Sequence, residues 1–349
     1  MQSLQIEAIS KASARQRAGR CGRTEPGSCL RLFAEDDHDK RDEFTPPEIQ
    51  RTNLAGVILQ MQSLGLGEPE EFPFLEPPES RRISEAYETL FELGAVDDRR
   101  VITPIGREMA RLPIDPRLAR ILIAARDEGV LADALVIASA LEVQDPRERP
   151  AEARDAADAK HQRFNDAASD FVTLLNLWDH YHSEKDRLSR SQLRKQCIAE
   201  FINAVRMNEW TDTHRQLRDQ CRELGWRVAR RKKELDRDGL HRAVLAGCLT
   251  TVGKRHDEGG FVSPFAGIFH VHPGSSVKAK GSTWLVTAEL VRTTRLYARL
   301  SARIEGAWVE ELAPHLIRRE YSDAEFIAER GGVEARAKVT FGQIEISRG

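Results

Sequence analysis

The chain has 349 residues, of which 31% are charged, 40% are apolar and 6% are aromatic, and its formal net charge at pH 7 is −2. At roughly 150 residues per domain, this length and composition predict two to three soluble, mainly helical domains. We expect a cytoplasmic protein without membrane contact or disulfides, because no apolar run approaches the roughly 18 residues of a membrane span, no secretory signal opens the chain, and the five cysteines are scattered.

The first stretch, residues 1–44, contains an Arg/Gly-rich segment at residues 15–23. A short run, SCLRLF at residues 28–33, follows it and predicts a strand, and the acidic residues 35–37 predict a turn after that strand. Residues 1–41 carry eight Lys/Arg against six Asp/Glu, a net charge of +2. This end of the chain is therefore one candidate surface for a polyanion.

Residues 45–113 predict a winged helix. Thr45 can cap a helix that starts with two prolines, and apolar residues then repeat at helical spacing up to residue 64. A second helix with an apolar face ends at Gly94, and two short apolar runs around a charged turn at residues 95–102 predict a small hairpin. Two helices followed by a hairpin are the elements of a winged helix.

Residues 114–238 predict a helical bundle. Asp115 and Pro116 are a capping residue and a first helical residue, and several later segments repeat apolar side chains at i, i+3, i+4 and i+7. Their spacing favours core packing over base stacking for the tryptophans of this region, Trp178, Trp210 and Trp226.

Residues 239–320 predict a helix followed by a small β-barrel of the OB type, because short strand-like segments alternate with glycine turns. Residues 240–320 carry 11 Lys/Arg against seven Asp/Glu, a net charge of +4. A barrel of this kind binds single strands through a basic groove. Residues 321–349 are expected to begin a C-terminal extension.

One glycine-flanked loop of the predicted barrel carries side chains that can donate hydrogen bonds to phosphates: Ser275, Ser276, Lys278 and Lys280. Such contacts hold any sequence equally well, so we expect RNA binding without base specificity. An ordinary solvated loop is the alternative interpretation.

The segment QRAGRCGR at residues 16–23 has the clearest chemistry in the chain. At 100° per residue, Gln16, Arg20 and Arg23 fall within about 60° of one another on one helical face. Gly19 and Gly22 lie beside this face and remove side-chain bulk. Two guanidinium groups aimed at one point suit a phosphate, which arginine binds in bidentate fashion. The alternative is an Arg/Gly tract in a solvated loop.

The context of this segment resembles the last helicase motif of the DEAH-box RNA helicases. The resemblance rests on ISKASARQRAGRCGRTEPG at residues 9–27 and on LPIDPRLAR at residues 112–120. It continues with SDF at residues 169–171, LLNLW at 174–178, FHVHPGSS at 269–276 and WLVTAELV at 284–291, which are similar to the ratchet and OB-fold of the bacterial HrpA-type members.

The resemblance implies a multidomain, mainly α fold with a small β-barrel. Its parts are the C-terminal end of a second RecA-like α/β domain (residues 1–44), a winged helix (45–113), a helical ratchet bundle (114–238), an OB-fold (239–320) and the start of a C-terminal extension (321–349).

The resemblance also implies that Arg20 and Arg23 are arginine fingers to the ATP γ-phosphate, that Gln16 orders the phosphate and the attacking water, and that Gly19 and Gly22 support ATP binding. No G-x-x-x-x-G-K-[ST] loop and no Asp-Glu-Ala-His motif occurs in the chain. We therefore expect ATP and Mg²⁺ to bind only in a longer parent that supplies the N-terminal RecA-like domains, and this chain alone to be inactive.

Two other groups of residues have polar or basic side chains close together in the sequence. His270 and His272 lie two apart on a predicted strand without an evident third ligand, so no metal site is predicted. The basic run at residues 227–233 is interpreted as a solvated face, with a phosphate-tracking surface as the alternative.

The sequence thus predicts the C-terminal portion of an ATP-dependent RNA helicase that couples ATP hydrolysis to translocation on single-stranded RNA. The alternative is a non-enzymatic RNA-binding or partner-binding module made by truncation. The missing phosphate loop favours the module for this chain alone, and the intact finger motif favours helicase ancestry.

Overall fold

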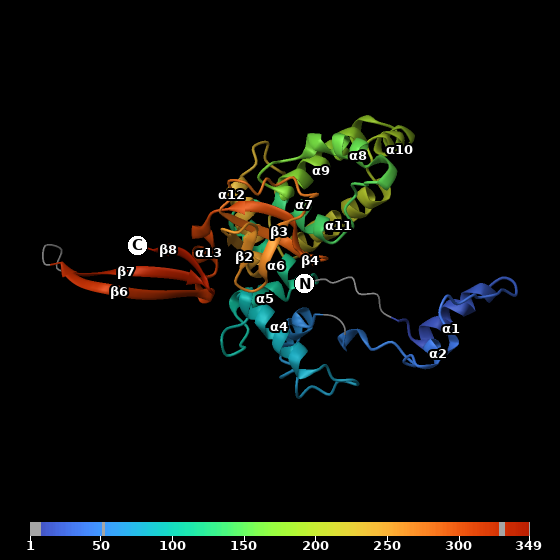
Figure 1. The fold of residues 1–349 in the computed structure, drawn as a ribbon, viewed down its shortest axis with the longest axis horizontal. Coiled ribbons are helices and arrows are strands. Elements are labelled where there is room, and N and C mark those ends of the chain that lie inside the picture. The colour runs from blue at the N-terminus through green and yellow to red at the C-terminus, as the bar shows by residue number, and fades with distance from the viewer. Residues whose placement is uncertain (1–7, 51–52, 328–331, 349) are drawn as a thin grey trace.

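The computed structural model describes residues 8–50, 53–327 and 332–348. Figure 1 shows a central body of helices and a β-barrel, with the first two helices at one end of the molecule and a long β-ribbon at the other. No helix among these residues is both long enough and apolar enough to cross a bilayer.

The N-terminal segment contains helix α1 (Lys11–Gly19), the 3₁₀ turn η1 (Arg20–Gly22) and helix α2 (Glu35–Asp39). The Ser10 hydroxyl caps α1 by accepting a hydrogen bond from the Ser13 N–H. The sequence predicts that Thr45 caps a helix, but no helix begins directly after it. The Thr45 hydroxyl lies 2.9 Å from Ser10 Oγ. It fastens the start of α1 to the end of the segment instead.

The prediction of a strand at residues 28–33 is wrong. These residues form no strand, and the side chains of Leu30 and Leu32 are 92% and 100% exposed. A strand needs a neighbour to pair its backbone groups, and the described part of the chain supplies none for this run.

The winged-helix region holds η2 (Glu48–Gln50), α3 (Ala55–Leu64), α4 (Ser80–Glu92) and α5 (Pro104–Met109). Gly65 and Gly94 end α3 and α4 in the left-handed conformation, with φ of 66° and 70°. The predicted hairpin is reduced to a single antiparallel bridge between Val96 and Ile102.

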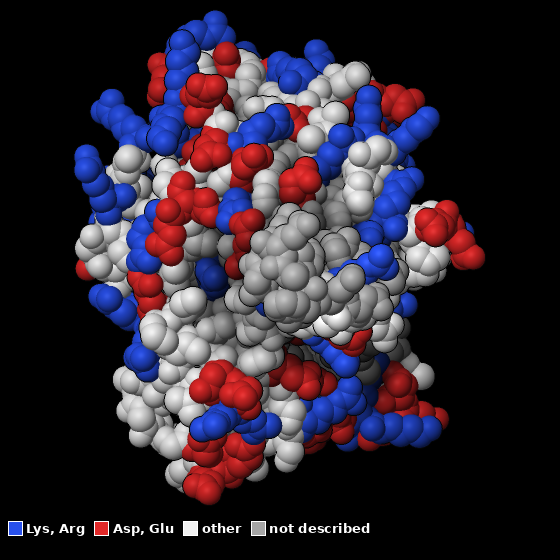
Figure 2. All heavy atoms as spheres, turned by 90° about the vertical axis from the view of Figure 1, so that its left-hand side faces the viewer, with Lys and Arg blue, Asp and Glu red and all other residues white. Residues whose placement is uncertain are grey.

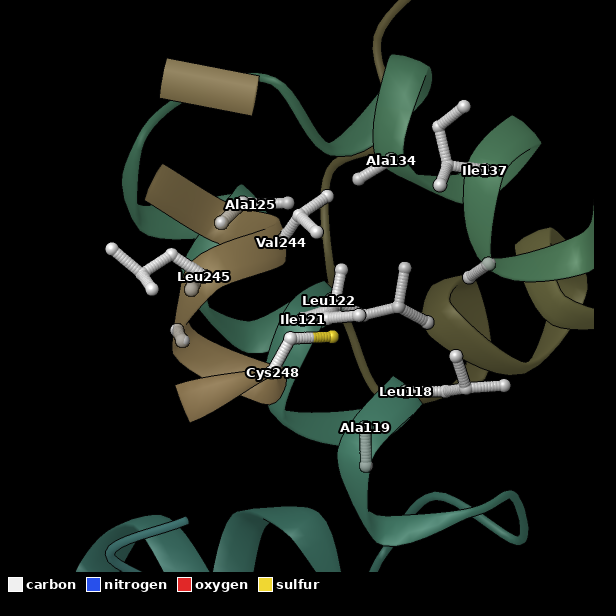
Figure 3. Close-up of a cluster of buried hydrophobic side chains, with 14 of the residues drawn as sticks. Leu118, Ala119, Ile121, Leu122, Ala125, Ala134, Ile137, Val244, Leu245 and Cys248 are labelled. Atoms are coloured by element: carbon white, nitrogen blue, oxygen red, sulfur yellow. The ribbon is translucent and has the colours of Figure 1, made fainter. Parts of the chain in front are cut away.

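The core of the helical bundle is built from α6 (Pro116–Asp127), α7 (Leu131–Leu141) and α12 (Arg237–Gly247). Figure 3 shows apolar side chains of these three helices turned toward one another, including Ile121, Ala134 and Val244. Gly247 permits the close approach of α12 to α6, because a Cβ atom there would lie 2.4 Å from the Arg117 carbonyl oxygen.

The remaining bundle helices are α8 (Arg154–His161), α9 (Asp170–Arg187), α10 (Arg190–Ala199) and α11 (Ala204–Glu223), with short 3₁₀ turns η3 (Ala151–Ala153) and η4 (Gln162–Phe164). Trp178, Trp210 and Trp226 are buried, as the sequence predicted. The Trp210 indole N–H donates to the Val136 carbonyl at 2.9 Å, which satisfies its polar end inside the core.

A 3₁₀ turn, η5 (Leu249–Thr251), leads into a closed barrel in the order β1-β2-β3-β5-β4. Its strands are β1 (Gly253–Arg255), β2 (Phe261–Ser263), β3 (Gly267–Val271), β4 (Trp284–Arg292) and β5 (Leu296–Ile304). The pairs are antiparallel except β3 with β5, whose parallel pairing closes the barrel. The interior holds Phe261 and Phe269 with stacked rings 5.8 Å apart.

The chain then forms α13 (Gly306–Leu312), η6 (Pro314–Leu316) and a three-stranded antiparallel sheet in the order β6-β7-β8. These strands are β6 (Ile317–Ile327), β7 (Gly332–Phe341) and β8 (Ile344–Arg348). Lys254 Nζ of the barrel donates to the Glu345 carbonyl at 2.7 Å and so ties the sheet to the barrel.

Candidate nucleic-acid interface

A cavity of about 820 Å³ lies where the bundle meets the barrel. Its walls come from the start of α6, the segment after α7, the start of α9, and the barrel strands β4 and β5 with the loops beside them. The charged residues that line it are Asp115, Arg117, Glu142, Asp145, Arg147, Arg149, Asp170, Arg206, Glu289 and Arg299.

Asp170 joins the two sides of this cavity. It is the first residue of α9 and is 3% exposed, and its carboxylate accepts hydrogen bonds from the Ser275 hydroxyl at 2.5 Å and from the Ser301 N–H at 2.9 Å. The Ser276 N–H and hydroxyl also donate to it, at 2.8 and 2.7 Å. These four bonds compensate the desolvation of a buried carboxylate and fix the barrel on the bundle.

The serines were predicted to donate to phosphates, but their hydroxyl protons are committed to Asp170. Ser275 and Ser276 therefore hold the loop in place. The sequence missed Asp170 because its partners lie more than 100 residues away along the chain.

A strained residue accompanies this junction. Leu300 has a φ of 58°, which is unusual for a branched side chain, and the pairing of β4 with β5 skips it. Leu300 lies between Arg299 and Ser301, and the Ser301 N–H donates to the Asp170 carboxylate at 2.9 Å.

An ordered arginine lies on the bundle side of the cavity. Arg147 Nη2 and Nε donate to Asp145 at 2.8 and 3.1 Å, and Arg206 donates to the Asp145 carbonyl at 3.0 Å. Burial raises the pKa of Asp145, but the adjacent Arg147 guanidinium outweighs burial and holds the pKa below its usual value. Both groups thus stay charged at neutral pH.

The cavity lining is electrically balanced, with five arginines against five carboxylates. Burial lowers the pKa of His272, and the nearby Arg299 and Arg149 lower it further, so this imidazole is neutral at pH 7. The face of the molecule that carries the C-terminal sheet is also mixed, with Lys/Arg and Asp/Glu interspersed in Figure 2. Attraction of a polyanion into this cavity must come from local contacts, because the lining has no excess of one charge.

Lys278 and Lys280 are exposed on the loop that Asp170 holds. The loop backbone is fixed, since the Lys278 N–H donates to the Ala167 carbonyl at 3.1 Å and Arg303 donates to the Lys278 carbonyl at 2.9 Å. Neither ammonium group forms an ion pair with any residue that the structure describes. Both are therefore available to phosphates.

The predicted finger residues lie far from this cavity in the chain and on an exposed surface. Gln16 is in α1, Arg20 opens η1 and Arg23 follows it, and all three side chains are exposed. In a 3₁₀ turn, residues i and i+3 eclipse one another, so Arg20 and Arg23 share a face here as well. A Cβ atom at Gly19 or Gly22 would meet nothing within 4 Å.

Gly27 has a role that sequence reasoning missed. A Cβ atom at this position would lie 2.3 Å from the Cys21 carbonyl oxygen, so only glycine lets the following loop fold back against the arginine segment. The sole signal in the sequence was its place in the motif.

Arg231, His270 and His272 have partners nearby. Arg231 of the basic run forms ion pairs with Asp133 and Asp179, whereas the other basic side chains of the run are exposed. His270 and His272 both lie near the Tyr297 ring, and no cluster of metal-ligating side chains is found among the described residues.

Three family models match this chain in the order of its elements. The helicase associated domain (HA2), winged-helix, matches residues 86–114; the helicase associated domain (HA2), ratchet-like, matches residues 115–174; and the oligonucleotide/oligosaccharide-binding (OB)-fold matches residues 240–317. The fold and the matches together define a helicase-associated module of winged helix, ratchet and OB-fold.

Curated relatives extend this match over nearly the whole chain. It is 44% identical over 346 residues to the ATP-dependent RNA helicase HrpA of Escherichia coli K12 and 43% identical over 348 residues to the HrpA homolog of Haemophilus influenzae, in each case 97% of this chain and 26% of the relative. It is 33% identical over 322 residues to the pre-mRNA-splicing factor ATP-dependent RNA helicase prp22 of Schizosaccharomyces pombe, covering 90% of this chain and 26% of that protein.

The three domain matches and the 44% identity over 97% of this chain support the C-terminal part of a DEAH-box helicase of the HrpA type. The chain spans about a quarter of the length of these relatives.

Proposed function

We propose that this chain is the RNA-holding C-terminal part of an ATP-dependent RNA helicase that translocates on single-stranded RNA. The observation that carries the proposal is the cavity between ratchet and barrel, with Lys278 and Lys280 on a fixed loop of the barrel. The relatives' names, which are those of ATP-dependent RNA helicases, support it.

The arginine segment has the role of a nucleotide sensor in this proposal. Arg20 and Arg23 reach the γ-phosphate of ATP, Gln16 orders the attacking water, and Gly19 and Gly22 leave room for the phosphates. Their exposure and the absence of ion pairs among the described residues support this role, because the guanidinium groups are free for a ligand.

Residues 1–44 are then the end of a second RecA-like domain. The exposure of Leu30 and Leu32 supports this assignment, since exposed apolar side chains suit a surface that the rest of that domain covers. The proposed domain limits after it are those expected from the sequence: winged helix 45–113, ratchet 114–238, OB-fold 239–320 and extension from residue 321.

ATP and Mg²⁺ act in the longer cytoplasmic parent, whose phosphate loop and Asp-Glu-Ala-His motif this chain does not contain. When bound in that parent, Mg²⁺ would supply positive charge that offsets the charge of the ATP phosphates. This chain contributes the arginines and the RNA contacts, and by itself it hydrolyses no ATP.

The binding part of the proposal is tested by fluorescence anisotropy of labelled oligo-U and mixed-sequence RNA at several salt concentrations. A few phosphate contacts imply a slope of log affinity against log salt of about −2, and replacing Lys278 and Lys280 by alanine should make it shallower by about one unit for both RNAs. Salt-independent binding or strong preference for one sequence would contradict backbone tracking. Absence of any RNA binding would favour the partner-binding module.

A further inference from the structure

One aromatic side chain that lines the cavity, Phe265, is unusually exposed for a residue of its size. Phe265 lies in the turn between β2 and β3, lines the cavity and is 47% exposed. Of the large apolar side chains that the structure describes as exposed, Phe265 is the one that lines this cavity.

The ring is held from behind by the C-terminal sheet. The fully buried ring of Phe341, at the end of β7, meets it edge to face, with centroids 5.4 Å apart and an interplanar angle of 71°. Gly342 follows with a φ of 56°, and a Cβ atom there would lie 2.5 Å from Pro264 Cβ, so the β7–β8 turn presses directly on the residue before Phe265.

The backbone of the turn is fixed as well. Ser263 Oγ donates to the Thr250 carbonyl at 3.0 Å and accepts from the Phe265 N–H at 3.4 Å. An exposed ring on a braced turn is pre-organised, so that a ligand binding to it loses little side-chain entropy.

We propose that Phe265 is a base-stacking residue for single-stranded RNA in the ratchet–barrel cavity, and that the C-terminal sheet positions it there. This inference rests on the proposed function. The balanced charge of the cavity lining means that affinity inside it must come from short-range contacts, and stacking on an aromatic face supplies such contacts for every base.

The test compares the full chain with three variants at this position. Phe265→Ala and Phe265→Leu remove the aromatic face, and Leu keeps an apolar side chain against Phe341 if Ala loosens the turn. Phe265→Tyr keeps the face. Ile268→Ala is the matched control, because Ile268 is equally exposed, at 47%, but does not line the cavity.

Phe265→Ala and Phe265→Leu should each weaken oligo-U and oligo-A RNA by about 5- to 100-fold with an unchanged salt slope, whereas Phe265→Tyr and Ile268→Ala should bind within about 2-fold of the original chain. A 2-aminopurine-labelled RNA should be quenched on binding the original chain and less so with Phe265→Leu. An abasic ribose-phosphate strand should not distinguish the variants.

Three outcomes would overturn the inference, each in a different way. If the original chain binds RNA with the expected salt slope and Phe265→Leu binds equally well, stacking is wrong and the proposed function stands. If the original chain does not bind RNA at all, both the stacking role of Phe265 and the proposed function are wrong for this chain. A loss on Ile268→Ala as large as that on Phe265→Ala would assign the effect to the barrel surface in general.

Discussion

The arginine segment and the ratchet–barrel junction are organised in opposite ways. Arg20 and Arg23 project from a short helical segment into solvent, and the hydrogen bonds around Ser10 and Thr45 hold only the base of that segment. At the junction, Asp170 is buried and receives hydrogen bonds from two separate parts of the barrel. The two arginines are free to bind another surface or a ligand. The Asp170 carboxylate already has its hydrogen-bond partners within this chain.

The largest effect is expected from the arginine segment, and it concerns ATP turnover. In the longer parent, Arg20→Ala or Arg23→Ala should lower ATP turnover by roughly 10³-fold, because an arginine on the γ-phosphate acts chiefly in the transition state. RNA affinity should stay nearly unchanged. Steady-state phosphate release and RNA anisotropy on the same protein measure both.

An equal loss of RNA affinity would instead place these arginines on RNA. The present chain alone should release no phosphate in the presence of RNA above the level of its Arg20→Ala, Arg23→Ala double variant.

Asp170→Ala tests the opposite region and should change stability. It leaves the buried N–H of Ser301 and the partly buried N–H of Ser276 without an acceptor, so we expect a loss of about 3–5 kcal/mol in the free energy of unfolding. Urea unfolding followed by circular dichroism measures it, with the exposed Asp98→Ala on the wing as the control. A loss below about 1 kcal/mol would mean that the junction does not depend on this carboxylate.

A buried histidine next to Asp170 should make the junction sensitive to acid. His241 is 5% exposed and its Nε2 lies 2.8 Å from Ser169 Oγ, and burial lowers its pKa to about 4 from an ordinary value of 6.5. Between pH 6.5 and 4 the unfolded chain takes up a proton that the folded chain refuses, so stability falls as the pH falls, by up to about 3 kcal/mol.

His241→Gln should remove this part of the pH dependence. The measurement is the free energy of unfolding of both proteins from pH 7.5 to 4. Parallel curves for the two proteins would show that His241 does not titrate in this way.

The winged helix should show the opposite trend, and a smaller one, because Glu92 is only partly buried and water screens part of the effect. Burial raises the pKa of Glu92 to about 7, with Glu88 adding to the effect and Arg117 opposing it. The folded chain then binds a proton that the unfolded chain has released, so this contribution to stability is complete below pH 4.5 and is lost as the pH rises through 7.

Glu92→Gln should therefore be more stable than the original chain at pH 8, by about 2 kcal/mol, and this advantage should vanish below pH 4.5. Thermal unfolding at both pH values measures it, with the exposed Glu76→Gln as the control. An advantage that is equal at both pH values would point to packing and not to charge.

The sequence alone was informative where contacts are local. Glycine stops, the Asp115 cap and the apolar spacing of α6, α9 and α11 predicted the helices, because a helix is stabilised by residues three or four apart. The barrel was predicted from short strands between glycine turns. The three-stranded C-terminal sheet was not, since its pairing depends on neighbours beyond the turn.

The face shared by the two arginines also depends only on nearby residues, because both α-helical and 3₁₀ geometry place Arg20 beside Arg23. The strand at residues 28–33 failed because a strand is defined by a partner that the alternation of its own residues cannot supply.

Only the tertiary structure decided the candidate RNA site. Ser169 caps α9, and nothing local indicates that Asp170 accepts from Ser276 and Ser301. Phe265 likewise depends on Phe341, 76 positions later. Burial of a carboxylate and exposure of a ring are set by what packs against them, and chain folding brings those neighbours together from distant positions.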